Sequence, residues 1–244
     1  MRMLCAVTEI SSGSSLNSRP SWLKQVGIVL RKDLRIEGNS GEVTTTSSFF
    51  AVLVVILASL SFHGGPQTGK VVMAGVVWLA ISFAAVLSLG RSWAREREGQ
   101  AMAGLMTSPL APSALYAGKV LGLLVFLGAI EAVVFPIAAL FFSVDLLMLA
   151  PGLLLLSAFA TPGIAAAGTL FGAMTVRTSA RDLALSVVLF PLLSPVLLTA
   201  IAGTRALLSG TPVEELGAYV RLLFIYDIAF FVGGLSLFGS LIED

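Results

Sequence analysis

Residues 91–110 read RSWAREREGQAMAGLMTSPL, and they separate two apolar runs that are each long enough to cross a membrane. Five of the first eight residues are charged, and the last four of these alternate in sign. Residues three or four positions apart, such as Arg91 and Arg95, lie along one surface of a helix, and a charged surface of this kind faces water. We therefore predict a short helix outside the bilayer.

The second half of this stretch carries an apolar stripe. Met102, Leu105 and Met106 recur at helical spacing, while glycines and alanines keep the rest of the surface thin. Pro109 and Pro112 predict the end of the helix. A thin amphipathic helix suits docking into a groove of a partner protein. The alternative is a solvated loop that lies on the lipid headgroups.

The composition indicates the class of protein. Of the 244 residues, 57% are hydrophobic and only 12% are charged, and the mean hydropathy is +0.95. A soluble globule needs more polar surface than this, so we predict an all-α polytopic membrane protein. The net charge of +1 does not suit a nucleic-acid-binding protein, and no nucleic-acid partner is expected.

The amino-terminal residues differ from the rest of the chain. They are rich in serine and lack the apolar core of a cleavable signal, so we predict a disordered extension over 1–20 and a six-helix transmembrane domain over 21–244. Cys5, the only cysteine, lies in this extension, which excludes an internal disulfide and a cysteine-rich metal site.

Residues 22–36 follow with apolar positions at helical spacing and basic residues between them. This pattern predicts an amphipathic helix in the membrane interface, with its basic residues toward anionic headgroups. An ordinary basic anchor beside the membrane is the alternative. Both interpretations place the segment in the cytoplasm. Gly38–Gly41 is expected to break the helix.

Six apolar runs are long enough to span the hydrocarbon core. The first has a polar entrance, and the third and fourth are long enough to tilt or kink, with Pro136 and Pro162 marking the positions. The predicted spans are 43–62, 71–90, 115–142, 149–174, 183–202 and 219–241.

The distribution of lysine and arginine predicts the orientation. With the amino terminus inside, twelve of the fifteen basic residues lie on the cytoplasmic side. Only Lys70, Arg205 and Arg221 lie on the other side. The positive-inside rule therefore places both termini and the helix over 91–110 in the cytoplasm.

Two carboxylates fall inside the predicted spans, Glu131 in the third and Asp227 in the sixth. A charge at membrane depth is costly and suggests either a function or a buried partner. For Glu131, the alternative to a functional role is a carboxyl group that is protonated or hydrogen-bonded to a neighbouring helix, and the two interpretations have equal weight. For Asp227, the alternative is a position in the membrane interface. Together they give a weak signal for a proton path.

Small residues dominate part of the fourth span, where Gly168 and Gly172 have the GxxxG spacing. Such a face allows close helix contact, either within the subunit or between two copies.

The inventory of ligating side chains argues against a cofactor held by this chain. His63 is the only histidine and lies at the end of the first span. Haem requires axial donors such as histidine, cysteine, methionine or tyrosine, and beyond one histidine and one cysteine the chain offers mostly methionines expected in the core. No GxxxxGK[ST] phosphate loop is present. If ATP is used, another chain binds it.

Four stretches resemble the CcmB family, the permease subunits of ABC-type complexes for cytochrome c maturation. The resemblance runs from about residue 22 to the carboxyl end, with six spans in order. The stretches are LRKDLRIE at 30–37, RSWARERE at 91–98, GLMTSP at 104–109 and LYAGK at 115–119.

The resemblance implies a multi-pass protein of the bacterial inner (cytoplasmic) membrane. The expected partners are a second copy, the ATPase CcmA, CcmC, CcmD and, indirectly, the haem chaperone CcmE. ATP hydrolysis by the ATPase would drive release of haem-loaded CcmE from CcmC, so the chain is expected to be non-catalytic, with ATP and haem held by its partners. The residues expected to couple the chain to the ATPase are Arg91, Arg95, Glu96, Arg97, Glu98, Met102, Leu105 and Met106.

Two other classes stay open. An ABC export permease for a lipid, drug or other small molecule would share this fold and would need a larger external gate or a lateral cavity. A structural scaffold or a small intramembrane enzyme is the third class, although no His/Asp, Ser/His or HExxH arrangement is present to activate water.

Overall fold

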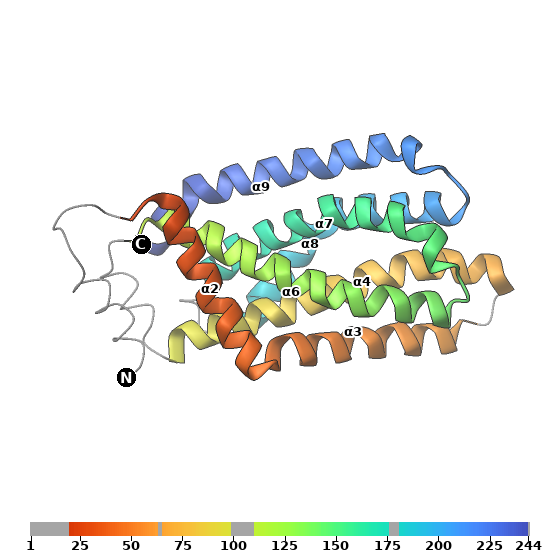
Figure 1. Cartoon of the computed structure of the whole chain (residues 1–244), viewed down its shortest axis with the longest axis horizontal. Coiled ribbons are helices and arrows are strands. Elements are labelled where there is room, and N and C mark those ends of the chain that lie inside the picture. Colours follow the sequence, from red (N-terminus) through yellow and green to blue (C-terminus); the bar gives the residue numbers. More distant parts are fainter. Residues whose placement is uncertain (1–19, 63–64, 99–109, 176–180, 244) are drawn as a thin grey trace.

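The computed structural model describes residues 20–62, 65–98, 110–175 and 181–243. Over these residues the chain is helical and contains no strand (Figure 1). In chain order the elements are α2 (Trp22–Ser40), α3 (Glu42–Ser61), α4 (Gly65–Glu98), α6 (Pro112–Phe141), α7 (Leu146–Thr175), α8 (Arg181–Leu208), the 3-10 helix η1 (Val213–Leu216) and α9 (Gly217–Glu243).

Six of these helices, α3, α4, α6, α7, α8 and α9, are long and apolar enough to cross a membrane. The predicted six-span architecture is confirmed, and the chain is a multi-pass membrane protein. The helices lie side by side along the long axis, and α2 crosses them at one end (Figure 1). This α2 end also holds the last turns of α4 and α9 and the first turns of α6, whereas the far end holds the α6–α7 and α8–α9 connections.

The buried face of α2 is more polar than predicted. Every third or fourth residue is buried, which is the period of a helix lying on a surface. Two of these buried residues are carboxylates. The face therefore holds charge as well as apolar surface, and it consists of Gln25, Val26, Val29, Asp33 and Glu37.

The turn between α2 and α3 lies at Gly41, the last residue of the segment Gly38–Gly41 where a break was predicted, and α2 continues through Ser40. Gly41 has a φ of 60°, in the left-handed region that glycine adopts without a steric penalty. Its N–H donates to the carbonyl of Glu37, and the Glu37 side chain accepts from the N–H of Thr44 at 2.7 Å. Glu37 thus fixes both sides of the turn, including the polar entrance of the first span.

The small-residue face of α7 packs within the subunit. A Cβ atom at position 168 would lie 2.5 Å from a methyl carbon of Leu89, and one at position 172 would lie 2.3 Å from Nε1 of Trp93. Both neighbours belong to α4, so the GxxxG spacing brings α4 and α7 close together. Pro136 and Pro162 lie inside helices that continue past them.

Candidate functional site

The charged stretch begins as the last part of α4. The apolar span of α4 covers Thr68–Trp93, and the helix continues without interruption to Glu98. The prediction of a separate helix beginning at Arg91 was therefore wrong, because no helix breaker separates the span from the charges. A force applied to residues 94–98 would therefore act directly on a membrane-spanning helix.

The apolar half of the predicted coupling helix lies outside the described residues. This applies to Met102, Leu105 and Met106, and their role stays a prediction. Arg95, Glu96, Arg97 and Glu98 are placed as helical backbone at the end of α4.

Arg91 is held by the neighbouring helix. Its guanidinium forms an ion pair with the carboxylate of Glu42, the first residue of α3, and both side chains are partly exposed. An exposed pair of this kind contributes about 1 kcal/mol or less. Its consequence is geometric, since it links the end of the second span to the start of the first.

A second ion pair lies deeper at the α2 end. The Lys119 ammonium lies 3.1 Å from Oδ2 of Asp33 and is 5% exposed, while Asp33 is 9% exposed. Lys32 also lies 3.4 Å from Oδ1 of Asp33. Lys119 stands in the second turn of α6, and Asp33 comes from the buried face of α2, so the pair joins these two helices.

The third member of this group is Trp93. The Lys119 ammonium lies 5.6 Å from the centre of a Trp93 ring, a distance at which a cation is attracted to the ring face. Trp93 is 5% exposed and ends the apolar span of α4. We call Asp33, Trp93 and Lys119 the Lys119 cluster. It connects α2, α4 and α6 at one point.

The packing around the Lys119 cluster is close. A Cβ atom at position 118 would lie 2.6 Å from Cβ of Val29, so the absence of a side chain at Gly118 allows α2 to lie against α6. The cavity beside the cluster measures only about 10 Å³, which is room for a single water at most. The cluster therefore joins helices and has no space for an organic ligand.

Sequence reasoning did not single out Asp33, Trp93 or Lys119. All three nevertheless lie in stretches that carried the family resemblance: Asp33 in 30–37, Trp93 in 91–98 and Lys119 in 115–119. A usable signal was available at Lys119, a single charge between the apolar residues Leu115 and Leu127. A buried lysine requires a partner, although its identity could not be read from a position 86 residues away.

Glu131 lies at the α6–α7 contact. It is 6% exposed, and its Oε1 accepts a hydrogen bond from the hydroxyl of Thr161. This arrangement matches the expected carboxyl group that is bonded to a neighbouring helix.

Asp227 reaches α7 from α9. Its Oδ1 is buried without a hydrogen-bond partner among the described residues, and a Cβ atom at position 163 would lie 2.5 Å from it. Gly163 and Thr161 are two positions apart, which places them on opposite sides of α7. The structure therefore separates Asp227 from Glu131 and does not assemble them into one site.

Metal-ligating side chains are dispersed over the described part of the chain. No three His, Cys, Asp or Glu side chains gather there into a group that could hold a metal ion. His63 lies outside the described residues.

The comparison with protein families identifies this architecture. The family described as CcmB protein matches residues 24–238, which include nearly all of α2 and of the six spans, together with the Lys119 cluster. The chain belongs to the CcmB family.

Individual relatives of this CcmB-family chain agree. It is 29% identical over 171 residues to a protein of Pseudomonas aeruginosa named "Heme exporter protein B", covering 70% of this chain and 76% of that protein. It is 28% identical over 186 residues to a protein of the same name from Bradyrhizobium diazoefficiens, covering 75% of this chain and 82% of that protein. The resemblance carried by the four stretches is thus confirmed.

Proposed function

We propose that this chain is the transmembrane permease subunit of an ABC-type complex in cytochrome c maturation. Its role is to couple ATP hydrolysis by the ATPase CcmA to release of haem-loaded CcmE from CcmC. Family membership over residues 24–238 and the "Heme exporter protein B" relatives support a part in haem handling. The chain itself contributes no catalytic group and holds neither ATP nor haem.

The observation that carries the coupling mechanism is the continuity of α4. This helix runs along the bundle with the other spanning helices and extends past its apolar span to Glu98. An ATPase that binds residues 91–98 would move α4 as a rigid rod, because displacing a continuous helix requires no break in its hydrogen bonds.

The Lys119 cluster gives this movement a path to other helices. Trp93 lies on α4, Lys119 lies near the start of α6, and Asp33 lies on α2. Gly172 places α7 against the same indole. A shift of α4 would therefore act on three neighbouring helices at the end of its apolar span.

The charge distribution supports the orientation, and the family resemblance supports the inner-membrane location. The complex lies in the bacterial inner membrane with the α2 end and both termini in the cytoplasm, as the excess of lysine and arginine at that end favours. CcmC, CcmD and a second copy of this chain complete the assembly, which is embedded in the lipid bilayer.

A charge reversal tests this proposal. Arg95→Glu combined with Arg97→Glu should abolish co-purification of CcmA while the permease still inserts, because both positions follow the apolar span of α4 and like charges can misalign an interface. Haem-loaded CcmE should accumulate and holocytochrome c should fall. Arg221→Glu, an exposed residue of α9 near the far end, is the matched control and should have no effect.

Two outcomes would contradict the proposal. Normal CcmA binding and normal cytochrome yield in the double reversal would show that residues 91–98 do not meet the ATPase. Lost CcmA binding with normal CcmE and cytochrome levels would indicate an export permease for a different substrate.

A further inference from the structure

The far end of the bundle carries a groove that the coupling role does not use. It has a volume of about 470 Å³, within the usual range for sites that bind small molecules. Its walls come from the last turns of α8 and the first turn of α9, and it is lined by Leu198, Ile201, Ala202, Arg205, Ser209 and Tyr219.

The lining changes character along α8. Leu198, Ala202 and Arg205 recur at three- and four-residue spacing on α8, and Ser209 follows directly after the helix, its N–H donating to the carbonyl of Arg205, so the four form one stripe. The stripe is apolar at Leu198, toward the middle of the span, and polar at Arg205 and Ser209, beside the connection to α9. Leu198 is 66% exposed, which opens the apolar part of the groove to the surrounding lipid.

The cationic end of the groove is formed by the guanidinium of Arg205. Arg205 forms no ion pair with any carboxylate among the described residues, although Glu214 and Glu215 lie in the nearby 3-10 helix η1. The Ser209 hydroxyl donates to the carbonyl of Arg205 at 2.8 Å, so the two polar positions are one turn apart. Tyr219 supplies the second wall, at a depth where tyrosine is common in membrane proteins.

We propose that this groove binds one phospholipid with an anionic headgroup. The Arg205 guanidinium would pair with the headgroup phosphate, and an acyl chain would follow the apolar stripe toward Leu198. The gradient from apolar to cationic matches an amphiphile whose body lies in the bilayer and whose charged group lies at its surface. The lateral opening to lipid favours a molecule that arrives from the bilayer over one that arrives from water.

Native mass spectrometry of the full chain in detergent tests the proposal. Phosphatidylglycerol and phosphatidylethanolamine are added separately, and lipid-bound fractions are measured for wild type, Arg205→Gln and Arg221→Gln. Wild type should retain one phosphatidylglycerol more strongly than phosphatidylethanolamine. Arg205→Gln should weaken phosphatidylglycerol binding about fivefold, the effect of one basic side chain near a membrane surface. It should weaken phosphatidylethanolamine binding less, because the ethanolamine ammonium already offsets the charge of the phosphate that Arg205 would contact. Arg221→Gln removes an exposed charge outside the groove and should behave as wild type.

A second variant examines the apolar wall. Ala202→Phe should fill the groove and reduce binding of both lipids while the melting temperature stays near that of wild type, because Ala202 is partly exposed. Equal losses in Arg205→Gln and Arg221→Gln would overturn the proposal in favour of non-specific surface charge. Unchanged binding in Ala202→Phe, or displacement of the bound phosphatidylglycerol by free haem, would overturn it as well.

Discussion

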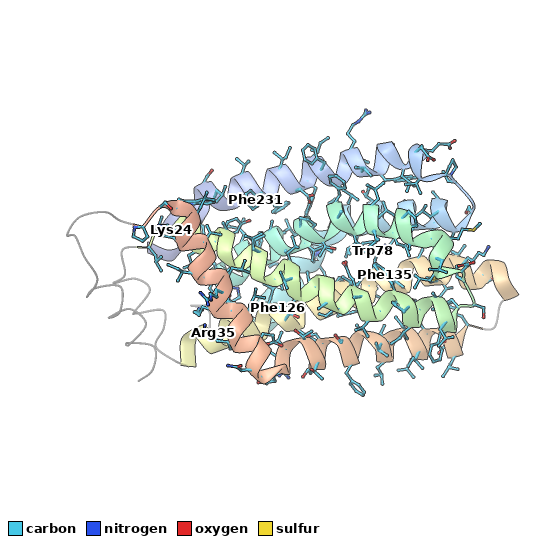
Figure 2. The ribbon with its side chains drawn as sticks, in the orientation of Figure 1. Lys24, Arg35, Trp78, Phe126, Phe135 and Phe231 are labelled. Carbon is cyan, nitrogen blue, oxygen red and sulfur yellow. The ribbon has the colours of Figure 1, made fainter. Side chains whose placement is uncertain are left out.

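Gly172 of α7 lies directly beneath the indole of Trp93 of α4, so that a Cβ atom at position 172 would come within 2.3 Å of Trp93 Nε1. Figure 2 shows the side chains of the bundle in the orientation of Figure 1, with the aromatic residues Trp78 and Phe135 in the half of the bundle toward the far end. Trp93 belongs to the opposite end, where the charged part of α4 begins. The absence of one side chain at Gly172 thus sets the distance between α7 and the helix that we propose as the coupling rod.

Substitution of Gly172 should therefore destabilise the bundle. Gly172→Ala places a methyl group in the space of the Trp93 ring, and overpacking of this kind costs about 2 kcal/mol. The melting temperature of the detergent-solubilised protein should fall. Gly233→Ala on α9 is the control, because a Cβ atom at position 233 would have no neighbour within 4 Å and alanine favours a helix over glycine. Equal melting temperatures for the two variants would contradict the close contact.

The Lys119–Asp33 pair should show strong coupling. Asp33→Leu removes the carboxylate that faces the buried Lys119 ammonium and should lower the free energy of unfolding by about 3 kcal/mol. Lys119→Met should cost less, because Lys32 still lies 3.4 Å from Asp33. The double variant should lose less than the sum of the two, since neither charge then remains. Lys24→Met, an exposed position on α2, should change stability by less than about 0.5 kcal/mol. Additive losses in the double variant would show that the pair is not an energetic unit.

The membrane orientation can be measured by cysteine accessibility. In a Cys5→Ser background, Arg97→Cys should react with a membrane-impermeant reagent only after the cells are opened, whereas Glu214→Cys should react in intact cells. The reason is that residue 97 lies at the α2 end and residue 214 at the far end of the bundle. Labelling of Arg97→Cys in intact cells would reverse the proposed orientation.

The fold was predictable where the sequence carries a strong local signal. Six apolar runs sufficed to find six spans, because hydrocarbon requires about twenty apolar residues per crossing. The boundaries were less predictable, since turns depend on single residues. The turn at Gly41 is an example: Gly38 also allows a break, but only Gly41 is followed by a helix whose first N–H groups Glu37 can reach.

The candidate site was predictable only in part. The charged end of α4 follows from its sequence, but the Lys119 cluster depends on three helices that meet only in the folded chain. The amphipathic pattern of α2 predicts an apolar buried face, so it gives no signal that Asp33 is buried. Its partner Lys119 was counted toward the charge of the cytoplasmic side. Contacts between distant charges leave no periodic trace in either segment.

Glu131 gives the last prediction. Glu131→Gln keeps an acceptor oxygen for the Thr161 hydroxyl and removes the possibility of a charge, so its melting temperature and cytochrome yield should stay near wild type. Glu131→Leu removes the acceptor and should lower the free energy of unfolding by about 1–3 kcal/mol, the cost of an unsatisfied buried polar group. Thr161→Val in the Glu131→Leu background removes the other partner as well and should recover part of that loss. If Glu131→Gln instead abolishes cytochrome maturation at unchanged stability, the carboxyl group itself takes part in function, and its contact with Thr161 is more than a link between α6 and α7.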